Sequence, residues 1–346
     1  MNDKEVELFK KTLKKKFEDA KFFTGEDLPP VVPNFTGSLK LDILLHGPFF
    51  EGAIVELFGE SGSGKTTLAL SVLNEAAKKN KKLLYLDQEM RLRDTLLSTF
   101  PELKEKLEVI QAPTGNEALQ IAELWTRQFP GSIVVVDSVD ALIPDNDKNI
   151  GEAQVGNLPR LMSDACRKLA RSCATAGSTV VFLNQIRSKI GAYGDPDTTS
   201  GGKALPFYAS QRIKLQQITA ATRIKDNNGN IVGHRARFKV VKNSVTVPFV
   251  EGDFPLIYGK GVDRVDELVD MACDLDVLKK EGNYILIADE NGEEKKRPPK
   301  TVKDMMRADP EFYTQTLEEI YALYPEIFKE ESVQQSNPED VVTIDE

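Results

Sequence analysis

One glycine-rich segment constrains the fold of this chain more than any other feature of its sequence. It follows a short apolar run, residues 53–58, and leads into a helix-like apolar run, residues 68–73. Glycines let such a loop curl so that successive N–H groups point at one anion, and the following helix adds its positive dipole end. The order strand, G-x-x-x-x-G-K-[ST], helix is typical of a phosphate-binding loop and predicts a nucleoside triphosphate site. The loop consists of Gly59, Glu60, Ser61, Gly62, Ser63, Gly64, Lys65, Thr66 and Thr67.

Two loop side chains and one carboxylate have separate predicted tasks. Lys65 is expected to reach the β- and γ-phosphates, and the Thr66 hydroxyl to hold Mg²⁺. A second apolar run, residues 133–136, ends in Asp137. In a parallel sheet that end lies beside the loop, so Asp137 is expected to join the magnesium site directly or through water.

Two further strand ends carry polar groups. Residues 83–86 lead into Asp87 and Glu89, and residues 179–183 lead into Gln185. Hydrolysis needs a base that orients water, for which Glu89 is the candidate, while Asp87 is expected to bond to nearby backbone. Gln185 could donate to a γ-phosphate. From the pattern alone, capping of a helix by Glu89 and of a loop by Gln185 are the simpler interpretations.

Composition and charge exclude several classes of protein. The chain has 346 residues, of which 40% are hydrophobic and 29% charged, which is ordinary for a globular protein of two or three domains. No apolar run is long enough to span a membrane, and the first residues are too charged for a secretory signal. Three cysteines and two histidines form no metal-ligand cluster and fit a reducing cytoplasm. A net charge of −9 argues against coating nucleic acid by bulk charge, but leaves room for a local groove.

The alternation of apolar runs and helical patterns predicts an α/β core with a mostly parallel sheet covered on both faces. The strand-like runs are residues 53–58, 83–86, 107–110, 133–136 and 179–183, and the helical patterns are residues 66–78, 91–106, 115–128 and 157–176. Residues 211–217 and 235–241 flank a turn at 226–230 and predict an antiparallel hairpin that extends the sheet.

The chain is expected to divide into four parts. Residues 1–33 form an amphipathic helix and a proline-rich linker, 34–260 the core, 261–329 a small α/β domain, and 330–346 an acidic disordered tail. Phe9 and Leu13 lie on the apolar face of the first helix. The pattern alone supports two readings equally: the helix packs on its own domain, or it docks onto a neighbouring subunit.

These motifs, in this order, resemble the RecA family of DNA recombinases over about residues 34–330. The resemblance implies a P-loop NTPase core and ATP-dependent assembly into a helical homo-oligomeric filament on single-stranded DNA. It further implies pairing with homologous duplex DNA, strand exchange and DNA-stimulated hydrolysis of ATP with Mg²⁺, with mediator or single-strand-binding proteins as further partners. The segments that carry the resemblance are residues 36–42, 59–67, 137–142, 162–169, 184–191, 198–202, 207–212 and 240–243.

The resemblance also implies roles for individual residues. Glu89 matches the water-activating carboxylate, Gln185 the γ-phosphate sensor, and Lys242 a cation that reaches the neighbouring subunit's ATP. Phe207 matches a residue that couples subunits, and the helix with Phe9 and Leu13 matches the oligomerisation element. Two loops, about 145–159 and 187–203, match DNA-binding loops, and the long second loop has the composition for backbone contacts and stacking. The expected DNA contacts are Val155, Gly156, Arg160, Arg167, Arg187, Lys189, Ile190, Gly191, Tyr193, Thr199, Gly201 and Gly202.

Several positions depart from the bacterial pattern of the family. Ser244 and Pro206 stand where lysines are expected at the subunit interface, the loop around 192–194 is one residue shorter, and the match weakens over 90–93. The departures indicate a divergent member, for which a phage origin is one explanation. They also support an alternative, a regulatory or loader module without strand exchange, while a ring-forming motor fits the N-terminal helix and the C-terminal domain less well. Deletion of residues 331–346 is expected to strengthen duplex binding and to shift the magnesium requirement.

Overall fold

The computed structural model describes residues 3–17, 23, 32–47, 49–147, 156–188, 197–217, 223–226, 228–289 and 292–328. The chain divides into two compact units, Met1–Val32 and Pro33–Glu346. The first unit contains helix α1 (Asp3–Lys16), and the second contains every other helix and strand named below. No helix in the described ranges combines the length and the apolar character needed to cross a membrane.

One large sheet organises the second unit. Its strand order is β13-β12-β11-β9-β3-β7-β6-β4-β5, in which the strands from β9 to β5 are parallel. The parallel strands are β3 (Ile54–Gly59), β4 (Leu83–Asp87), β5 (Leu107–Ile110), β6 (Ile133–Asp137), β7 (Thr179–Ser188) and β9 (Gln211–Gln217). The antiparallel extension consists of β11 (Ile231–Asn243), β12 (Glu251–Ile257) and β13 (Gly261–Val262), with β10 (Arg223–Lys225) beside β11 and β8 (Asp197–Thr199) beside β7.

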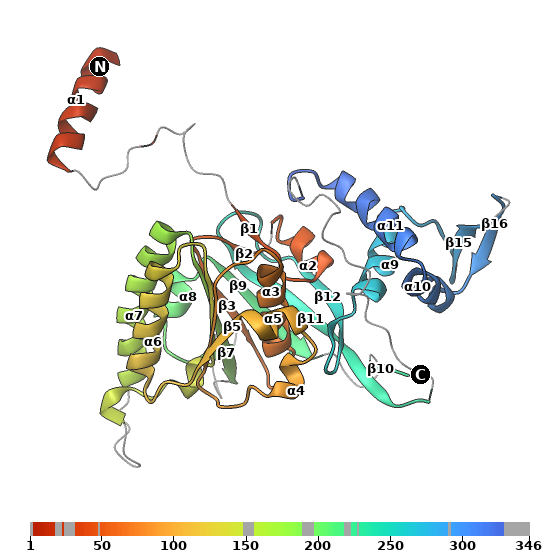
Figure 1. Ribbon diagram of the computed structural model, residues 1–346, viewed down its shortest axis with the longest axis horizontal. Coiled ribbons are helices and arrows are strands. Elements are labelled where there is room, and N and C mark those ends of the chain that lie inside the picture. Colours follow the sequence, from red (N-terminus) through yellow and green to blue (C-terminus); the bar gives the residue numbers. More distant parts are fainter. Residues whose placement is uncertain are drawn as a thin grey trace. The chain divides into compact units, whose positions relative to one another are not determined.

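Alternating side chains of the parallel strands supply two separate cores. In β6, Ile133 and Val135 face one core while Val134 and Val136 face the other, and β4 divides its residues in the same way. Figure 1 shows α3 and α5 over one face of the sheet and α6 and α7 over the other. Burial on both faces explains the nearly continuous apolar runs. The helices of this unit up to β9 are α2 (Leu39–Leu44), α3 (Lys65–Lys78), α4 (Asp94–Leu97), α5 (Pro101–Lys106), α6 (Gly115–Gln128), α7 (Asn157–Ala176) and α8 (Ala204–Tyr208).

The predicted α/β fold with a mostly parallel sheet is confirmed, with two local corrections. The helix expected over 91–106 is interrupted, because Pro101 begins a new helix at α5 and the residues between α4 and α5 turn. The expected pairing of 211–217 with 235–241 is present as β9 against β11, but the turn at Asp226 joins β10 to β11. The short strand β10 therefore lies between β9 and β11 in the sequence, although β9 and β11 pair directly.

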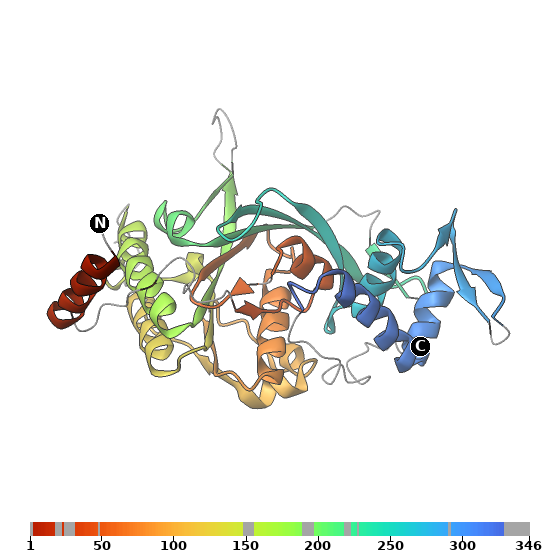
Figure 2. The same ribbon diagram turned by 90° about the horizontal axis from the view of Figure 1, so that it is seen from above.

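The C-terminal part of the second unit has its own core and a small antiparallel sheet. Its core residues include Val265, Leu268 and Ile320, and α2 contributes Ile43 to it. In Figure 2 the blue C-terminal helices lie beyond the teal antiparallel strands of the large sheet. The elements are α9 (Arg264–Asp274), β14 (Lys280–Glu281), β15 (Tyr284–Ala288), β16 (Glu294–Arg297), α10 (Pro299–Ala308) and α11 (Pro310–Leu323), while β1 (Pro33–Asn34) and β2 (Phe49–Phe50) form a separate pair near the start of the unit. The four-part division of the chain stays a prediction.

Buried polar contacts join this C-terminal part to the core. The carboxylate of Glu267 in α9 accepts hydrogen bonds from the Ser38 hydroxyl at 2.6 Å and from the backbone N–H of Leu39 at 3.0 Å and Lys40 at 3.2 Å. These groups lie at the start of α2, so Glu267 satisfies N–H groups that a helix start leaves without intrahelical partners. Arg235 of β11 pairs with Asp253, Asp266 and Asp270, which extends the connection to the sheet.

Candidate nucleotide and DNA site

The polar strand ends expected from the sequence meet at one edge of the parallel sheet. Gly59 of β3 is in register with Gln185 of β7, and Asp87 of β4 with Asp137 of β6. β6 and β7 are themselves neighbours. The carboxyl ends of parallel strands form the usual ligand site of an open α/β sheet, so these residues share one crevice.

Glycine is required at two positions of the phosphate-binding loop. A Cβ atom on Gly59 would lie 2.0 Å from the carbonyl oxygen of Leu215, and one on Gly64 would lie 2.3 Å from the Leu256 side chain. Gly64 also has a φ of 94°, in the left-handed region that other residues avoid. The loop is therefore held between β3 and the strands β9 and β12.

The polar groups of the loop fit a phosphate ligand. The Lys65 ammonium donates to the carbonyl oxygens of Gly59 at 3.0 Å and Glu60 at 2.7 Å, so it lies folded over the loop. The buried Ser63 hydroxyl has no hydrogen-bond partner among the described residues. Burial lowers the pKa of Lys65, and the carboxylates of Asp137 and Glu89 act in the opposite direction. Lys65 is thus a partly buried ammonium group beside the loop, and such a group suits a polyanionic ligand.

Thr66 and Asp137 form the oxygen donor set expected of a magnesium site. The Thr66 hydroxyl donates to Asp137 Oδ2 at 3.1 Å, and the Tyr85 hydroxyl donates to the same oxygen. Burial raises the pKa of the Asp137 carboxyl, although its hydrogen bonds with Tyr85 and Thr66 oppose that shift. Hydroxyl and carboxylate oxygens are the donors that Mg²⁺ prefers, and the residues present therefore fit this ion.

Glu89 is held beside this donor set by three side chains. Its Oε1 accepts from the Ser138 hydroxyl at 2.5 Å and from Gln185 Nε2 at 3.4 Å, and its Oε2 lies 3.1 Å from Arg91. The backbone N–H of Glu89 donates to the Asp137 carbonyl at 3.1 Å. The carboxylate is thus held at the strand tips, beside the residues of the candidate magnesium site.

Asp87 differs from Glu89 in its partners. It is buried and accepts from the backbone N–H of Arg91 at 3.0 Å and Leu92 at 3.2 Å, and from Gln111 Nε2 at 3.0 Å. The predicted backbone-bonding role of Asp87 is confirmed. Its bonds shape the segment after β4 and so position Glu89.

The residue before Gln185 connects the strand tip to the centre of the sheet. Asn184 accepts from the Gln185 backbone N–H at 2.9 Å and donates to Glu56 at 2.9 Å and to the Ser200 carbonyl at 3.1 Å. Glu56 is fully buried and pairs with Arg212 of β9 at 2.5 Å. Because buried charges are costly when unpaired, this string of contacts fixes the orientation of the strand ends.

Lys242 lies on β11, which is separated from β3 and the phosphate-binding loop by β9, and it contacts α8. Its ammonium donates to the carbonyl oxygens of Phe207 at 2.7 Å and Pro206 at 3.2 Å. Burial and then the charge of Arg212 lower the pKa of Lys242. Phe207 is 74% exposed. Two residues after Lys242, the backbone N–H of Ser244 donates to the Ser210 carbonyl. Within one chain, Lys242 therefore caps the carbonyl end of the helix that carries Phe207.

The structure describes part of the expected DNA loops. Gly156 caps the start of α7 and Arg160 lies in its first turn, while Arg167 lies near the middle of the helix and pairs with Asp164 at 3.2 Å. Thr199 ends β8, which pairs with β7 opposite Ile186, and the turn with Gly201 and Gly202 follows directly. Val155, Lys189, Ile190, Gly191 and Tyr193 lie outside the described residues, and only the backbone of Arg187 is described.

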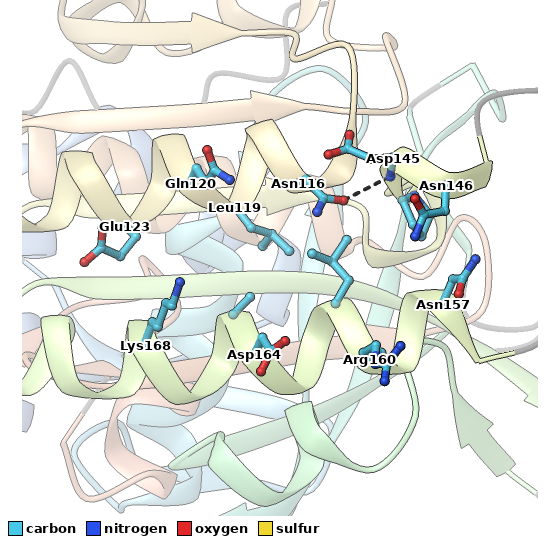
Figure 3. A pocket seen from close by; sticks show the side chains of 13 residues that line it. Asn116, Leu119, Gln120, Glu123, Asp145, Asn146, Asn157, Arg160, Asp164 and Lys168 are labelled. Atoms are coloured by element: carbon cyan, nitrogen blue, oxygen red, sulfur yellow. Dashed lines mark hydrogen bonds between the residues drawn. The ribbon is translucent and has the colours of Figure 1, made fainter.

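A pocket of about 380 Å³ opens between α6 and α7 beside the first of these loops. Figure 3 shows Arg160 and Lys168 of α7 on one side and Asn116 and Glu123 of α6 on the other. Asn116 accepts from the Asp145 backbone N–H at 3.1 Å, at one end of the pocket. The mixed charges make it a polar groove that contains Arg160 and no residue of the phosphate-binding loop.

Helix α1 exposes the apolar residues that the sequence singled out. Phe9 is 57% exposed, Leu13 is half-buried, and Leu8 and Phe17 are exposed as well. An exposed apolar stripe on a single helix is typical of a contact surface.

Sequence reasoning missed three residues of the site. Ser138 holds Glu89, Tyr85 holds Asp137, and Arg91 pairs with Glu89. Tyr85 reads as one more apolar strand residue, and its hydroxyl is recognised only once β4 and β6 are neighbours. Ser138 and Arg91 carried a weak clue, because Ser138 directly follows Asp137 and Arg91 lies two residues after Glu89.

A phosphate loop at the carboxyl edge of a mostly parallel sheet, faced by a magnesium-type donor set and a fixed carboxylate, defines a P-loop nucleotide-hydrolysing protein. The chain belongs to the RecA family, since the RecA N-terminal domain family matches residues 8–263. It is 42% identical over 280 residues to Protein RecA 2 of Myxococcus xanthus, covering 80% of this chain and 76% of that protein. It is 38% identical over 331 residues to Protein RecA of Chloroherpeton thalassium, covering 92% and 90%.

These comparisons confirm the expected bacterial-type RecA membership and the main functional prediction. The chain is a RecA-type DNA recombinase and a DNA-dependent ATPase. A similar relative, Protein RecA of Bifidobacterium breve, is 40% identical over 279 residues and covers 79% of this chain and 70% of its own length. The alternative of a regulatory or loader module without strand exchange is not favoured.

Proposed function

We propose that this recombinase hydrolyses ATP at the crevice formed by the ends of β3, β4, β6 and β7. The observation that carries the proposal is the position of Glu89, which Ser138 and Gln185 hold beside Asp137 and the phosphate loop. The triphosphate would lie on the backbone N–H groups of residues 59–67, with Lys65 released from its two carbonyl contacts to reach the β- and γ-phosphates. Thr66 and Asp137 would hold Mg²⁺, which supplies charge neutralisation at the phosphates.

Glu89 is the proposed base of the reaction. Its carboxylate orients a water molecule opposite the leaving ADP and accepts the proton of that water as the oxygen attacks the γ-phosphorus. The bond between the γ-phosphorus and the ADP oxygen breaks, and ADP and inorganic phosphate leave. Arg91 and Gln185 lie against Glu89, so both can adjust its position when the γ-phosphate arrives or departs.

Gln185 is the proposed link from ATP to DNA. It stands two residues before Arg187, at the start of the 187–203 segment, and its amide is within reach of Glu89. A group that contacts the γ-phosphate on one side and begins a DNA loop on the other lets ATP order that loop. The proposed DNA contacts are Val155, Gly156, Arg160, Arg167, Arg187, Lys189, Ile190, Gly191, Tyr193, Thr199, Gly201 and Gly202.

The proposed working form is a helical filament of this chain on single-stranded DNA that pairs with homologous duplex DNA. Lys242 and Phe207 would face the neighbouring subunit, and α1 would dock onto it through Phe9 and Leu13. Exposure of Phe207 supports the first of these contacts. Mediator or single-strand-binding proteins remain proposed partners.

The first experiment measures ATP hydrolysis with and without single-stranded DNA for the wild type and Glu89→Gln. Loss of a general base reduces turnover by about 10²–10⁴-fold, while the amide keeps the shape of the site and nucleotide binding. Glu102→Gln, an exposed carboxylate at the start of α5, is the control and should be unaffected. A Glu89→Gln protein with normal DNA-stimulated turnover would exclude Glu89 as the base.

A further inference from the structure

A small turn connects the nucleotide site to the returning end of the second DNA loop. Asp140 lies in the 3-10 helix η1 (Val139–Ala141), three residues after Asp137 of the proposed magnesium site. Ser200 follows β8, the strand by which the 187–203 segment returns to the core. The two residues are far apart in sequence, and the fold brings them together.

Both polar groups of Ser200 contact residues near the nucleotide site, one in η1 and one in β7. Its hydroxyl donates to Asp140 Oδ1, and its carbonyl accepts from Asn184 Nδ2 at 3.1 Å. Asn184 in turn accepts from the backbone N–H of Gln185 at 2.9 Å. A hydroxyl bonded to a carboxylate is a charge-assisted contact, about twice as strong as a neutral one.

Close packing fixes the turn after Ser200. A Cβ atom on Gly201 would lie 3.0 Å from Val139 in η1 and 3.0 Å from Met162 in α7. A Cβ atom on Gly202 would lie 3.0 Å from Pro159, the last residue of the first candidate DNA loop. The turn therefore packs against both η1 and the beginning of α7. The ends of the two candidate DNA loops lie side by side there.

We propose that Asp140 is a positioning residue that couples the nucleotide site to the second DNA loop through the Ser200 hydroxyl. This connection is separate from the Gln185 amide and joins the opposite end of the same loop. It rests on the proposed function, because it needs a triphosphate at Lys65 and DNA at the 187–203 segment.

Electrostatics gives the direction of the coupling. The charge of Asp140 is one of those that raise the pKa of Lys65 against the larger effect of burial, so the ammonium and this carboxylate interact. A triphosphate engages Lys65 with its own negative charge and leaves Asp140 less neutralised. The carboxylate then depends more strongly on its Ser200 donor, and the seated form of the turn is favoured. By linkage, DNA that stabilises the seated turn strengthens triphosphate binding by the same factor.

The test compares the affinity for a fluorescein-labelled oligo(dT) in the presence of ATPγS and of ADP. The ratio of the two dissociation constants measures the coupling. We expect Ser200→Ala and Asp140→Ala each to reduce this ratio by about five- to tenfold, the lower part of the usual range for coupled sites. The double variant should lose no more than either single variant, because both remove one contact.

Two further variants separate coupling from damage to the fold. Ser200→Thr keeps the hydroxyl and should keep most of the ratio. Ser172→Ala removes a similar serine–glutamate bond of 3.0 Å between α7 and α6 and should leave the ratio unchanged. ATP hydrolysis without DNA should stay within about twofold of wild type in the three serine variants, a small change on the free-energy scale.

The outcomes distinguish this inference from the proposed function. If wild type hydrolyses ATP and its DNA affinity depends on the nucleotide, but Ser200→Ala keeps the full ratio, the Asp140–Ser200 connection is wrong and the proposed site stands. If wild type shows neither hydrolysis nor nucleotide-dependent DNA binding, the proposed function fails first. A loss of the ratio that Ser200→Thr does not restore would assign the effect to packing and overturn the role of the hydroxyl.

Discussion

At the scale of single residues, the site depends on side chains that hold other side chains. Glu89 receives its position from Ser138 and Gln185, and Asp137 from Thr66 and Tyr85. Such support keeps the proposed reacting groups in place before the substrate binds, which lowers the cost of organising the site during the reaction. The same principle applies to Lys242, whose ammonium donates to two α8 carbonyl oxygens within the described part of its own chain.

Replacing Lys242 with alanine should reduce DNA-stimulated ATP turnover by at least about 10²-fold, since it removes the cation proposed to act on the neighbour's ATP. Ser244 supplies no second cation, so little compensation is expected. Lys239→Ala on the same strand is the matched control, because Lys239 is exposed and pairs with Glu251. Steady-state turnover with excess single-stranded DNA is the measurement. Normal turnover in Lys242→Ala would eliminate it as the acting cation and point to a solution cation such as potassium.

At the scale of helices and strands, sequence patterns were sufficient wherever one period persisted. The expected helices at 115–128 and 157–176 agree with α6 and α7, because their apolar faces repeat regularly against a buried sheet. The pattern failed at Pro101, because a proline begins a new helix there and divides the expected one. It also failed at β10, because three residues are too few to show an alternation of apolar and polar side chains. Partners such as Tyr85 depend on which strands are neighbours, and a single strand's pattern does not contain that information.

The contact between α9 and α2 should make stability depend on pH. Burial raises the pKa of the Glu267 carboxyl from 4.5 to about 7, although its hydrogen bond with Ser38 and those from two backbone N–H groups oppose the shift. The folded protein therefore binds more protons at this group than the unfolded chain. The contribution of Glu267 is fully present below about pH 4.5 and is lost as the pH rises through about 7.

Glu267→Gln should remove this part of the pH dependence. Between pH 5 and pH 8, the free energy of unfolding of wild type should fall by up to about 3 kcal/mol more than that of the variant. Urea unfolding at both pH values measures the difference. Asp137 and Asp263, whose carboxyl pKa values burial also raises, contribute equally to both proteins and cancel. Parallel pH curves for the two proteins would show that Glu267 titrates normally in the fold.

At the scale of the whole molecule, the chain has surfaces that suit assembly with copies of itself. α1 carries an exposed apolar stripe, and Phe207 is exposed near Lys242. The sequence predicted which residues these are, from helical spacing and family resemblance. It could not decide between the two readings of α1 from pattern alone, because an amphipathic face does not specify its partner.

Phe9→Ala should weaken filament assembly by about tenfold or more, because burial of a phenylalanine side chain contributes about 1.5–3 kcal/mol. Sedimentation of the protein with oligo(dT) and ATPγS over a range of protein concentrations measures the effect. Lys11→Ala, an exposed residue away from the apolar stripe, is the control. Assembly that is equally strong in Phe9→Ala would favour packing of α1 within its own chain.

The order in which the ribosome makes the chain has a consequence for the phosphate loop. Gly59 and Gly64 leave the ribosome early. Leu215 and Leu256, which lie closest to them in the folded protein, are synthesised roughly 150 to 190 residues later. At the usual pace of synthesis the interval is on the order of ten to forty seconds. During that time the nascent loop lacks its neighbouring strands, so a nascent or truncated chain that stops short of β12 should not capture nucleotide.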